Sequence, residues 1–200
     1  MPKYDYKNIA NFIFELNQLK RQENNGFKKC GVQHTHSTAS HIWRAAQIGY
    51  ILAELEGDAN PEQVAAIILV HDNAEIRIGD QDKIAARYYS TKQAEMNAFQ
   101  DQLKNLGLQI ETKWKKYFQE FENRNTKEGI IAKDADWLEQ AFQAKEYVDQ
   151  GYSAAEDWIN NVAKALETKS AKLLLEEMKK IKFTDWWQGL KKMTYKKLDK

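Results

Sequence analysis

Apolar residues recur three and four positions apart along almost the whole chain, which is the period of helices with one buried face. The segment NPEQVAAIILV, residues 60–70, begins such a helix, with Asn60 as a suitable N-cap and Pro61 at the first helical position. No strand pattern competes with this period. The sequence therefore predicts an all-α fold, with helices at residues 5–22, 37–56, 60–77, 91–106, 111–124, 127–150, 154–167 and 170–181 and a short one at 184–195.

The helical pattern runs through the chain without a recognisable linker. Only two prolines occur, and we find no internal repeat or Gly/Ser-rich tract. Two hundred residues with 42% hydrophobic content can bury one substantial core, so we expect one domain over residues 1–200. Residues 23–36 and 77–90 are expected to be the longer irregular connections, where functional groups often lie. Three tryptophans of the C-terminal third are expected to pack and not to take part in chemistry: Trp158, Trp186 and Trp187.

Charge and cysteine content argue against several classes of protein. The chain has 30 basic and 29 acidic residues, and this balance gives no electrostatic case for binding nucleic acid. Its single cysteine, Cys30, excludes an internal disulfide framework and fits a reducing compartment. No apolar run approaches the roughly 20 residues that span a bilayer, and the N-terminus lacks a signal-peptide core. We therefore expect a cytoplasmic protein with no membrane or nucleic-acid partner.

The segment VHDNAEIRIGD, residues 70–80, interrupts the apolar pattern with ionisable groups. His71 and Glu75 follow Val64 and Ile68 at three- and four-residue spacing, so they continue the buried face of that helix. Asp72 borders the same space. A core-facing helix therefore ends in an imidazole and carboxylates.

The helix that begins near residue 37 presents a second inward imidazole. His41 shares a face with Ala45, Ile48, Leu52 and Leu55. A lone histidine on such a face is usually a core residue bonded to a carbonyl group. Two imidazoles buried with carboxylates are costly unless they are paired or bind a metal. Nitrogen and carboxylate ligands together suit Zn, Mn, Fe, Co or Ni more than Ca, so the spacing favours a metal site.

The next candidate carboxylates are Asp134 and Asp136, in the helix predicted at 127–150. Helical phase alone favours Asp134, which falls at the edge of the stripe that contains Ile131 and Leu138. That helix is apolar nearly all round, so phase decides little. Either aspartate could instead pair with Lys133.

A histidine, a His-Asp pair and a distant aspartate, all on helices, resemble the metal-dependent HD phosphohydrolase superfamily. The stretches HSTASH, LVHDNAEIRIGD and KDADWLE look like those of the small HD-domain hydrolases that include bacterial 5'-deoxynucleotidases. The resemblance covers about residues 14–150 and implies an HD-domain helical bundle, on which the helices of 151–200 pack. It favours Asp136, which directly precedes WL. It implies that four residues bind a divalent cation (Mn, Co, Zn, Fe, Ni or Mg): His41, His71, Asp72 and Asp136.

The resemblance also implies a catalytic role for Glu75 and a catalytic or substrate-site role for Asp80. Glu75 would orient the nucleophile or protonate the leaving 5'-oxygen, and Asp80 would accept a hydrogen bond from a sugar hydroxyl. Two simpler roles stay open. Glu75 could hold His71 in one tautomer, and Asp80 could be an ordinary turn residue after Gly79.

The chain departs from the deoxynucleotidase pattern where the substrate is read. Asn24 stands where an arginine that holds the phosphate is common, and His36 stands where an acidic residue is common. The phosphate is then expected to meet another cation. Spacing does not choose among four candidates, which are Arg21, Lys28, Arg44 and Arg77. We assign Arg44 and Arg77, together with Asp80, as the substrate-binding residues.

These features predict a metal-dependent phosphohydrolase, most simply a phosphomonoesterase whose substrate is a nucleoside 5'-monophosphate. The alternatives are a nucleoside triphosphate hydrolase or a di-iron oxygenase on the same fold, and a non-catalytic module that a metal stabilises. A di-iron oxygenase needs further metal ligands, and His34 and His36 are the only histidines not yet assigned to a role. A purely structural metal module would not need Glu75. Relatives of this kind are often dimers, so a homodimer is expected by analogy, with interface candidates Tyr88, Tyr89, Trp186 and Trp187.

Overall fold

The computed structural model describes residues 4–104 and 106–191, and every regular element in these ranges is helical. The prediction of an all-α fold is confirmed. The α-helices are α1 (Tyr6–Leu16), α2 (Asn25–Lys28), α3 (Thr38–Glu56), α4 (Pro61–His71), α5 (Glu75–Ile78), α6 (Lys92–Leu103), α7 (Leu108–Asn123), α8 (Lys127–Asp149), α9 (Glu156–Ala165) and α10 (Lys169–Lys180). Short 3₁₀ segments accompany them: η1 (Asn17–Lys20), η2 (Ala85–Arg87), η3 (Ser153–Ala155) and η4 (Asp185–Trp187).

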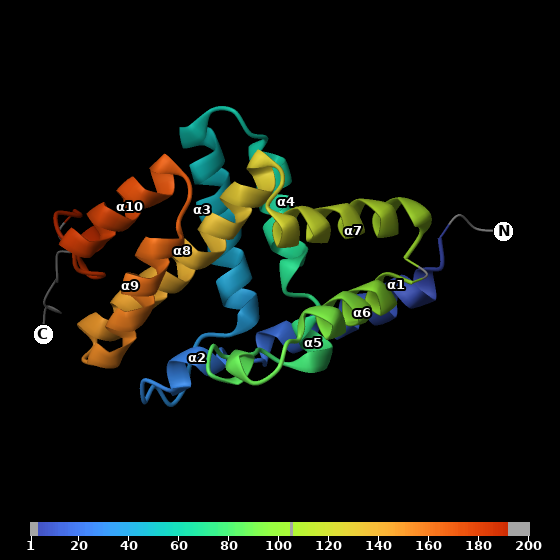
Figure 1. Cartoon of the computed structure of the whole chain (residues 1–200), viewed down its shortest axis with the longest axis horizontal. Coiled ribbons are helices and arrows are strands. Elements are labelled where there is room, and N and C mark those ends of the chain that lie inside the picture. Colours follow the sequence, from blue (N-terminus) through green and yellow to red (C-terminus); the bar gives the residue numbers. More distant parts are fainter. Residues whose placement is uncertain (1–3, 105, 192–200) are drawn as a thin grey trace, which may run out of the picture.

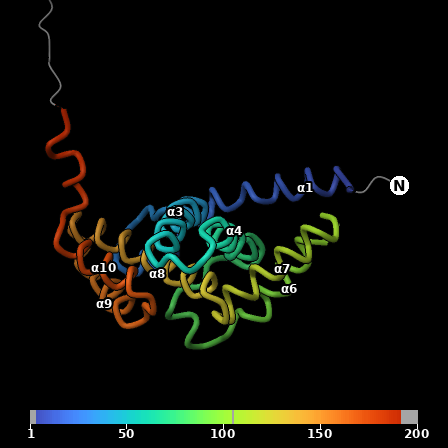
Figure 2. The backbone as a smooth tube through the Cα atoms, turned by 90° about the horizontal axis from the view of Figure 1, so that it is seen from above, coloured from blue at the N-terminus to red at the C-terminus, as the bar shows by residue number. Residues whose placement is uncertain are grey.

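Helices α3, α4 and α8 form the centre of the bundle (Figures 1 and 2). Helix α3 packs against both α4 and α8, α7 packs against α4 and α8, and α9 and α10 pack against α8. Figure 2 shows α9 and α10 at one side of the central helices and α6 and α7 at the other. The three central helices supply fully buried side chains to the core: Leu52, Ile67, Ile68, Ile131 and Leu138.

Helix α3 comes close to both of its neighbours at Gly49. A Cβ atom at this position would lie 2.3 Å from Ile68 Cδ1 of α4 and 3.4 Å from Ala135 Cβ of α8. The buried face of α3 is therefore centred on Gly49, further round the helix than the predicted stripe. Leu55 was assigned to that stripe wrongly, since it is 62% exposed. The physical reason is that α3 is buried against two helices and not one.

The helix predicted at residues 60–77 is divided in two. Helix α4 ends at His71, and α5 begins at Glu75. Between them, the N–H groups of Asn73 and Glu75 donate to carbonyl oxygens three residues back, at 3.3 and 3.0 Å. This tight turn replaces the continuous helix of the prediction and turns the chain beside the end of α4.

Three other segments also differ from the predicted boundaries. The helix predicted at 5–22 is α1 followed by η1, and it ends at Lys20. Residues 23–36 contain the short helix α2, whose N-cap Asn24 accepts hydrogen bonds from the N–H groups of Gly26 and Phe27. Of the helix predicted at 184–195, the structure shows only η4, and Gly189 then takes a positive φ of 83°. Residues 192–195 lie outside the described residues.

No helix among the described residues combines the length and apolar character needed to cross a membrane. The connection predicted at 77–90 is irregular apart from the end of α5 and the short η2. This connection lies next to α2, as a 2.5 Å hydrogen bond from the Asn25 N–H to a carboxylate oxygen of Asp80 shows. The two irregular segments predicted from the sequence therefore meet.

Candidate active site

Two imidazoles and two carboxylates meet where α3, α4 and α8 come together. His41 lies in the first turn of α3, His71 ends α4, Asp72 is the C-cap of α4, and Asp136 lies in the middle of α8. His71 Nε2 lies 3.0 Å from Asp72 Oδ2, and His41 Nε2 lies 3.1 Å from Asp136 Oδ1. The crossed distances, His41 to Asp72 and His71 to Asp136, are both 3.8 Å. We call these four residues the HD cluster.

The donor set of the HD cluster fits a divalent cation. His71 Nδ1 donates to the carbonyl oxygen of Ile68 at 2.6 Å, so its Nε2 is the nitrogen left to face the cluster. That Nε2 atom is buried and has no hydrogen-bond partner among the described residues. A buried polar atom without a partner is costly, and a metal ion would satisfy it. Two imidazole nitrogens with two carboxylate oxygens suit a first-row divalent metal.

Glu139 fixes the orientation of His41 from behind. The Nδ1 atom of His41 lies 2.5 Å from Glu139 Oε2, which leaves Nε2 to face the HD cluster. Burial would lower the pKa of His41, but the carboxylates of Glu139 and Asp136 raise it well above its ordinary value. Burial likewise raises the pKa of Glu139, yet His41 and Arg44 hold it below its ordinary value. A carboxylate bonded to the outer nitrogen of a ligating histidine is a recurrent support of metal sites.

Arg44 neutralises Glu139 and does not line the cavity beside the cluster. Its Nε and Nη2 atoms lie 2.8 and 2.7 Å from Glu139 Oε1, and its Nη1 lies 2.5 Å from Glu146 Oε1. The guanidinium expected to bind substrate is thus engaged with two carboxylates. Glu139 was not singled out in the sequence, although its position three residues after Asp136 places it on nearly the same side of α8.

The structure brings Asp136, and not Asp134, to the HD cluster. Both Asp134 oxygens accept hydrogen bonds from the Glu167 N–H, at 3.0 and 3.1 Å, and the Thr168 N–H donates to Oδ2 at 2.7 Å. Asp134 therefore anchors the connection between α9 and α10. Burial would raise the pKa of Asp136, but the Lys133 ammonium, 2.8 Å from Oδ2, together with His41 lowers it well below its ordinary value.

A cavity of about 710 Å³ opens beside the HD cluster. Part of its wall is acidic and includes Glu75, Asp80 and Asp82. Another part is aromatic and includes Phe121, Trp137 and Trp158. The cluster is thus accessible to a small molecule that offers both polar and ring-shaped groups.

The comparisons with known proteins agree with this arrangement. A family model described as HD domain matches residues 16–179. The chain belongs to the HD domain family. The curated 5'-deoxynucleotidase HDDC2 of Dictyostelium discoideum is 30% identical to it over 152 residues, which cover 72% of this chain and 79% of that protein. The 5'-deoxynucleotidase hdd1 of Schizosaccharomyces pombe is 32% identical over 147 residues, which cover 70% and 72%.

Solved structures share the fold of this chain. A conserved hypothetical protein from Pyrococcus furiosus matches with a TM-score of 0.73 and 28% identity, over 86% of this chain and 99% of that one. The family expected from HSTASH, LVHDNAEIRIGD and KDADWLE is therefore confirmed, and so is the HD-domain bundle.

Glu75 lies on the cavity wall of this HD domain, and its carboxyl group has its own supports. Gln22 Nε2 and Thr38 Oγ1 donate to Glu75 Oε2 at 3.1 and 3.3 Å. Burial, together with Asp72 and Asp80, raises the pKa of Glu75 well above its ordinary value. The alternative role of holding the tautomer of His71 is filled by the Ile68 carbonyl instead.

Asp80 also reaches the cavity, from the connection after α5. The Asn25 N–H donates to its Oδ2 atom, and Asn25 Nδ2 donates to its carbonyl oxygen at 2.9 Å. Burial raises its pKa, although the Asn25 hydrogen bond opposes this. Asp80 is therefore more than a turn residue, since it joins α2 to the cavity wall.

None of the four cations considered from the sequence lines the cavity. Arg77 forms a two-point ion pair with Glu15, at 2.6 and 3.0 Å, and so faces α1. Lys28 pairs with Glu23 at 2.9 Å, and Arg21 bonds to Gln18 at 3.5 Å. Three other cations line the cavity instead: Lys83, Arg87 and Lys133. Spacing gave no signal for Lys83 and Arg87, because tertiary packing folds their connection over the cluster.

The two positions that depart from the deoxynucleotidase pattern have structural roles. Asn24 caps α2 and lines the cavity. His36 does not line it: its ring lies against Phe27 and Tyr147, and burial lowers its pKa to about 4. His36 is therefore a neutral packing residue behind His41.

Substitution of the two aspartates separates metal binding from helix anchoring. We expect Asp136→Asn to lose its divalent cation, as His71→Ala and Asp72→Ala should, because each change removes a donor from the HD cluster. Asp134→Asn should keep a stoichiometric ion and lower the melting temperature, because Asp134 anchors residues 167–168. Metal content by mass spectrometry and melting by calorimetry check both. A stoichiometric ion in purified Asp72→Ala or Asp136→Asn protein would contradict the ligand assignment.

Glu139→Gln is expected to weaken metal binding without removing it. Loss of the carboxylate behind His41 should lower the affinity about 10- to 100-fold, the usual range for such outer partners. Competition with a chromophoric chelator measures this affinity. The control is Glu146→Gln, which also removes a partner of Arg44 but does not touch His41, and it should change the affinity little. Equal affinities in the parent and Glu139→Gln proteins would show that this carboxylate is only structural.

Proposed function

We propose that this HD domain is a phosphomonoesterase that hydrolyses nucleoside 5'-monophosphates, with a divalent cation bound by His41, His71, Asp72 and Asp136. The observation that carries the proposal is the meeting of these four donors at the wall of a cavity that also contains the carboxyl group of Glu75. The names of the curated relatives, which are 5'-deoxynucleotidases, support the same substrate class.

The HD cluster would hold the cation, and the other residues of the cavity would handle the substrate. A cation of this kind polarises a phosphoryl oxygen and lowers the pKa of a water molecule. Glu75 lies at the cavity wall, and burial together with Asp72 and Asp80 raises its pKa, which favours a carboxyl group that donates a proton to the departing 5'-oxygen. Gln22 and Thr38 keep the acceptor oxygen of Glu75 in place.

Lys133 is our candidate for the cation that replaces the arginine absent at Asn24. Its ammonium group lines the cavity, bonds Asp136 at 2.8 Å and lies 4.3 Å from the centre of the Phe121 ring. The ammonium group is thus held beside the HD cluster, where it would stabilise the negative charge of a phosphoryl group. Asp80, at the wall, would accept a hydrogen bond from a sugar hydroxyl.

A nucleoside triphosphate hydrolase is the second candidate. Two further cations of the cavity wall, Lys83 and Arg87, are exposed and suit a longer phosphate chain. The oxygenase is less well supported, because the second histidine and carboxylate group, His36 with Glu139, shares His41 with the HD cluster.

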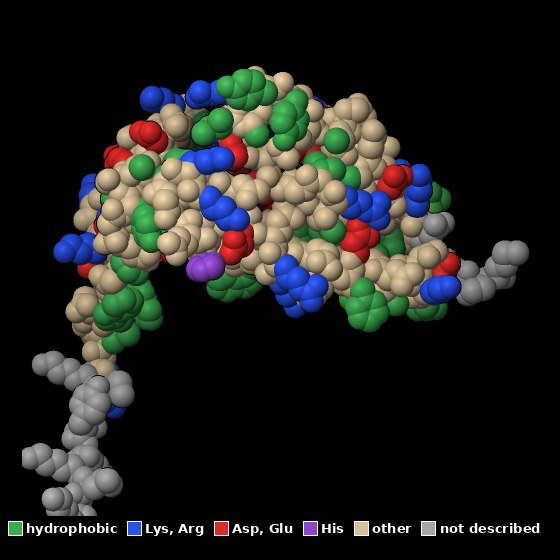
Figure 3. Space-filling model, turned by 90° about the horizontal axis from the view of Figure 1, so that it is seen from below, with side chains coloured by type: hydrophobic (Ala, Val, Ile, Leu, Met, Phe, Trp, Pro, Cys, Tyr) green, Lys and Arg blue, Asp and Glu red, His purple; other side chains and the backbone are tan. Residues whose placement is uncertain are grey.

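We infer that the chain acts as a cytoplasmic homodimer without a nucleic-acid partner. Tyr88 and Trp186 are 83% and 72% exposed, so both are available to an interface. Basic and acidic side chains are mixed over the face shown in Figure 3, and no continuous basic surface forms there. This supports the absence of a nucleic-acid site.

A substrate panel tests the proposed function. Metal-loaded protein is incubated with nucleoside 5'-mono-, di- and triphosphates, and phosphate, pyrophosphate and triphosphate are measured. We expect phosphate and nucleoside from the monophosphates. Release of triphosphate would favour the second candidate, and no product from any nucleotide would leave only a metal-stabilised binding module.

Glu75→Gln is expected to separate chemistry from binding. The amide keeps the volume and the hydrogen bonds of the carboxyl group but cannot transfer a proton. Turnover of a nucleoside 5'-monophosphate should fall by about two to four orders of magnitude. Metal content and substrate affinity should stay near those of the parent. A near-parental rate would rule out the proton-transfer role, and loss of the metal would place Glu75 among the ligands.

A further inference from the structure

The cavity continues from the HD cluster to helix α9, where its wall is apolar and aromatic. Trp158, Val162 and Ala165 of α9 all line it. The sequence predicts a packing role for Trp158, and the ring does stack on Phe27, with centroids 5.0 Å apart and planes 28° apart. Trp158 therefore both packs and faces the cavity.

The position of the Trp158 ring is fixed by its neighbours. Phe27 is fully buried and supports the ring by stacking. At Gly26, a Cβ atom would lie only 3.3 Å from Trp158 Cζ2, so the indole lies close against a backbone that has no side chain. An aromatic ring held this way is preorganised for a flat ligand, because little side-chain freedom remains to be lost.

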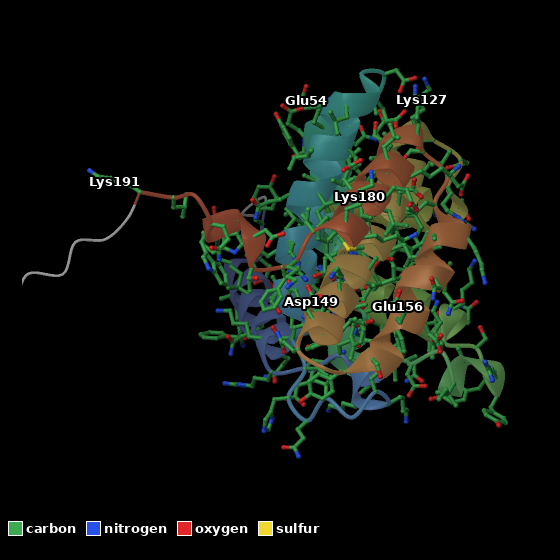
Figure 4. The ribbon with its side chains drawn as sticks, turned by 90° about the vertical axis from the view of Figure 1, so that its left-hand side faces the viewer. Glu54, Lys127, Asp149, Glu156, Lys180 and Lys191 are labelled. Atoms are coloured by element: carbon green, nitrogen blue, oxygen red, sulfur yellow. The ribbon has the colours of Figure 1, made fainter. Side chains whose placement is uncertain are left out.

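The distance from the HD cluster to Trp158 suits a nucleotide. Figure 4 shows Asp149 and Glu156 at the same end of the pair α8 and α9, and Asp134 binds Glu167 at the other end, so the helices run antiparallel. Trp158 lies two residues after Glu156 and nine residues before Glu167, so it is level with residues 143–147 of α8. This is seven to eleven residues, or about 10 to 16 Å, beyond Asp136 along the helix axis. A pentose joins a phosphate at one end of such a span to a base at the other.

Asn161 adds a polar group to the same wall. It lies one turn after Trp158 on α9, lines the cavity and is exposed. Its amide has no hydrogen-bond partner among the described residues, and an amide offers both donors and an acceptor. It can therefore bond to the edge of more than one kind of ring.

We propose that Trp158 and Asn161 form the nucleobase subsite of this cavity. The inference rests on the proposed function, since it places the base of the nucleotide whose phosphate meets the HD cluster. The base stacks on the indole, and the sugar lies between the indole and the cluster. Because every base has a π-face, stacking favours ligands that have a base but does not discriminate between one base and another. Purine and pyrimidine nucleotides are therefore both substrates.

The test compares a substrate that has a base with one that lacks it. For Trp158→Ala, KM for deoxyadenosine 5'-monophosphate should rise about 5- to 150-fold, the range for loss of base stacking. Values of kcat/KM for 2-deoxyribose 5-phosphate should stay within about two-fold of the parent, since that substrate has no base to lose. Trp158→Phe should restore most of the affinity. Trp43→Ala, at an exposed tryptophan of α3 outside the cavity, is the matched control and should change the kinetics of neither substrate.

Two further measurements keep the inference independent of folding and of the proposed function. Asn161→Ala alters an exposed side chain and should raise KM for the nucleotide alone, even if Trp158→Ala fails to fold. Calorimetry of deoxyadenosine binding to metal-free protein needs no catalysis. If the parent binds the nucleoside through Trp158 but hydrolyses no phosphate, the proposed function fails and the subsite stands. Nucleotide hydrolysis with no effect of Trp158 or Asn161 on KM, or an equal effect on both substrates, would overturn the subsite.

Discussion

The close approach of α3 to both α4 and α8 at Gly49 is the constraint on which the site depends. A Cβ atom there would overlap the buried side chains of Ile68 and Val64 and would just touch Ala135, so glycine lets α3 lie this close to α4 and α8. His41 lies two turns before Gly49, His71 one turn after Ile68, and Asp136 directly follows Ala135. The same packing that builds the core therefore brings the three side chains within ion-pair distance.

The charged groups that this packing brings together alternate in sign along the contact between α3 and α8. Six groups form this series: Glu146, Arg44, Glu139, His41, Asp136 and Lys133. When His41 is protonated, each group lies close to a neighbour of opposite charge. Such a series offsets the desolvation cost that any one of these groups would meet alone. Among the described residues, His71 Nε2 is the cluster atom left without a hydrogen bond, and a cation would complete the arrangement.

Helical period and the family motifs were enough to predict the fold class and to single out four residues that the structure brings together. The helical period failed for residues whose burial depends on contact with a second neighbouring helix. The stripe through Leu55 assumed one partner for α3, and the phase argument for Asp134 assumed one buried face for α8, whereas α8 contacts α3, α4, α7, α9 and α10. Asp134 is buried because it anchors the connection to α10, a role that its own helix does not reveal.

The rest of the site comes from segments without a periodic signal. The turn after His71 depends on local hydrogen bonds at Asn73 and Glu75, within a pattern that otherwise continues as a helix. Lys83 and Arg87 reach the cavity through an irregular connection, and Trp158 through the antiparallel return of α9. Sequence spacing cannot place such residues, because their position depends on how distant helices pack.

The central prediction is that the HD cluster holds a divalent cation at one end of the cavity. Anomalous X-ray diffraction from crystals grown with manganese or zinc tests it directly. We expect a strong peak about 2.0–2.3 Å from His41 Nε2, His71 Nε2 and one oxygen each of Asp72 and Asp136. A peak bound instead between His36 and Glu139, or no peak at the HD cluster at saturating metal, would contradict it.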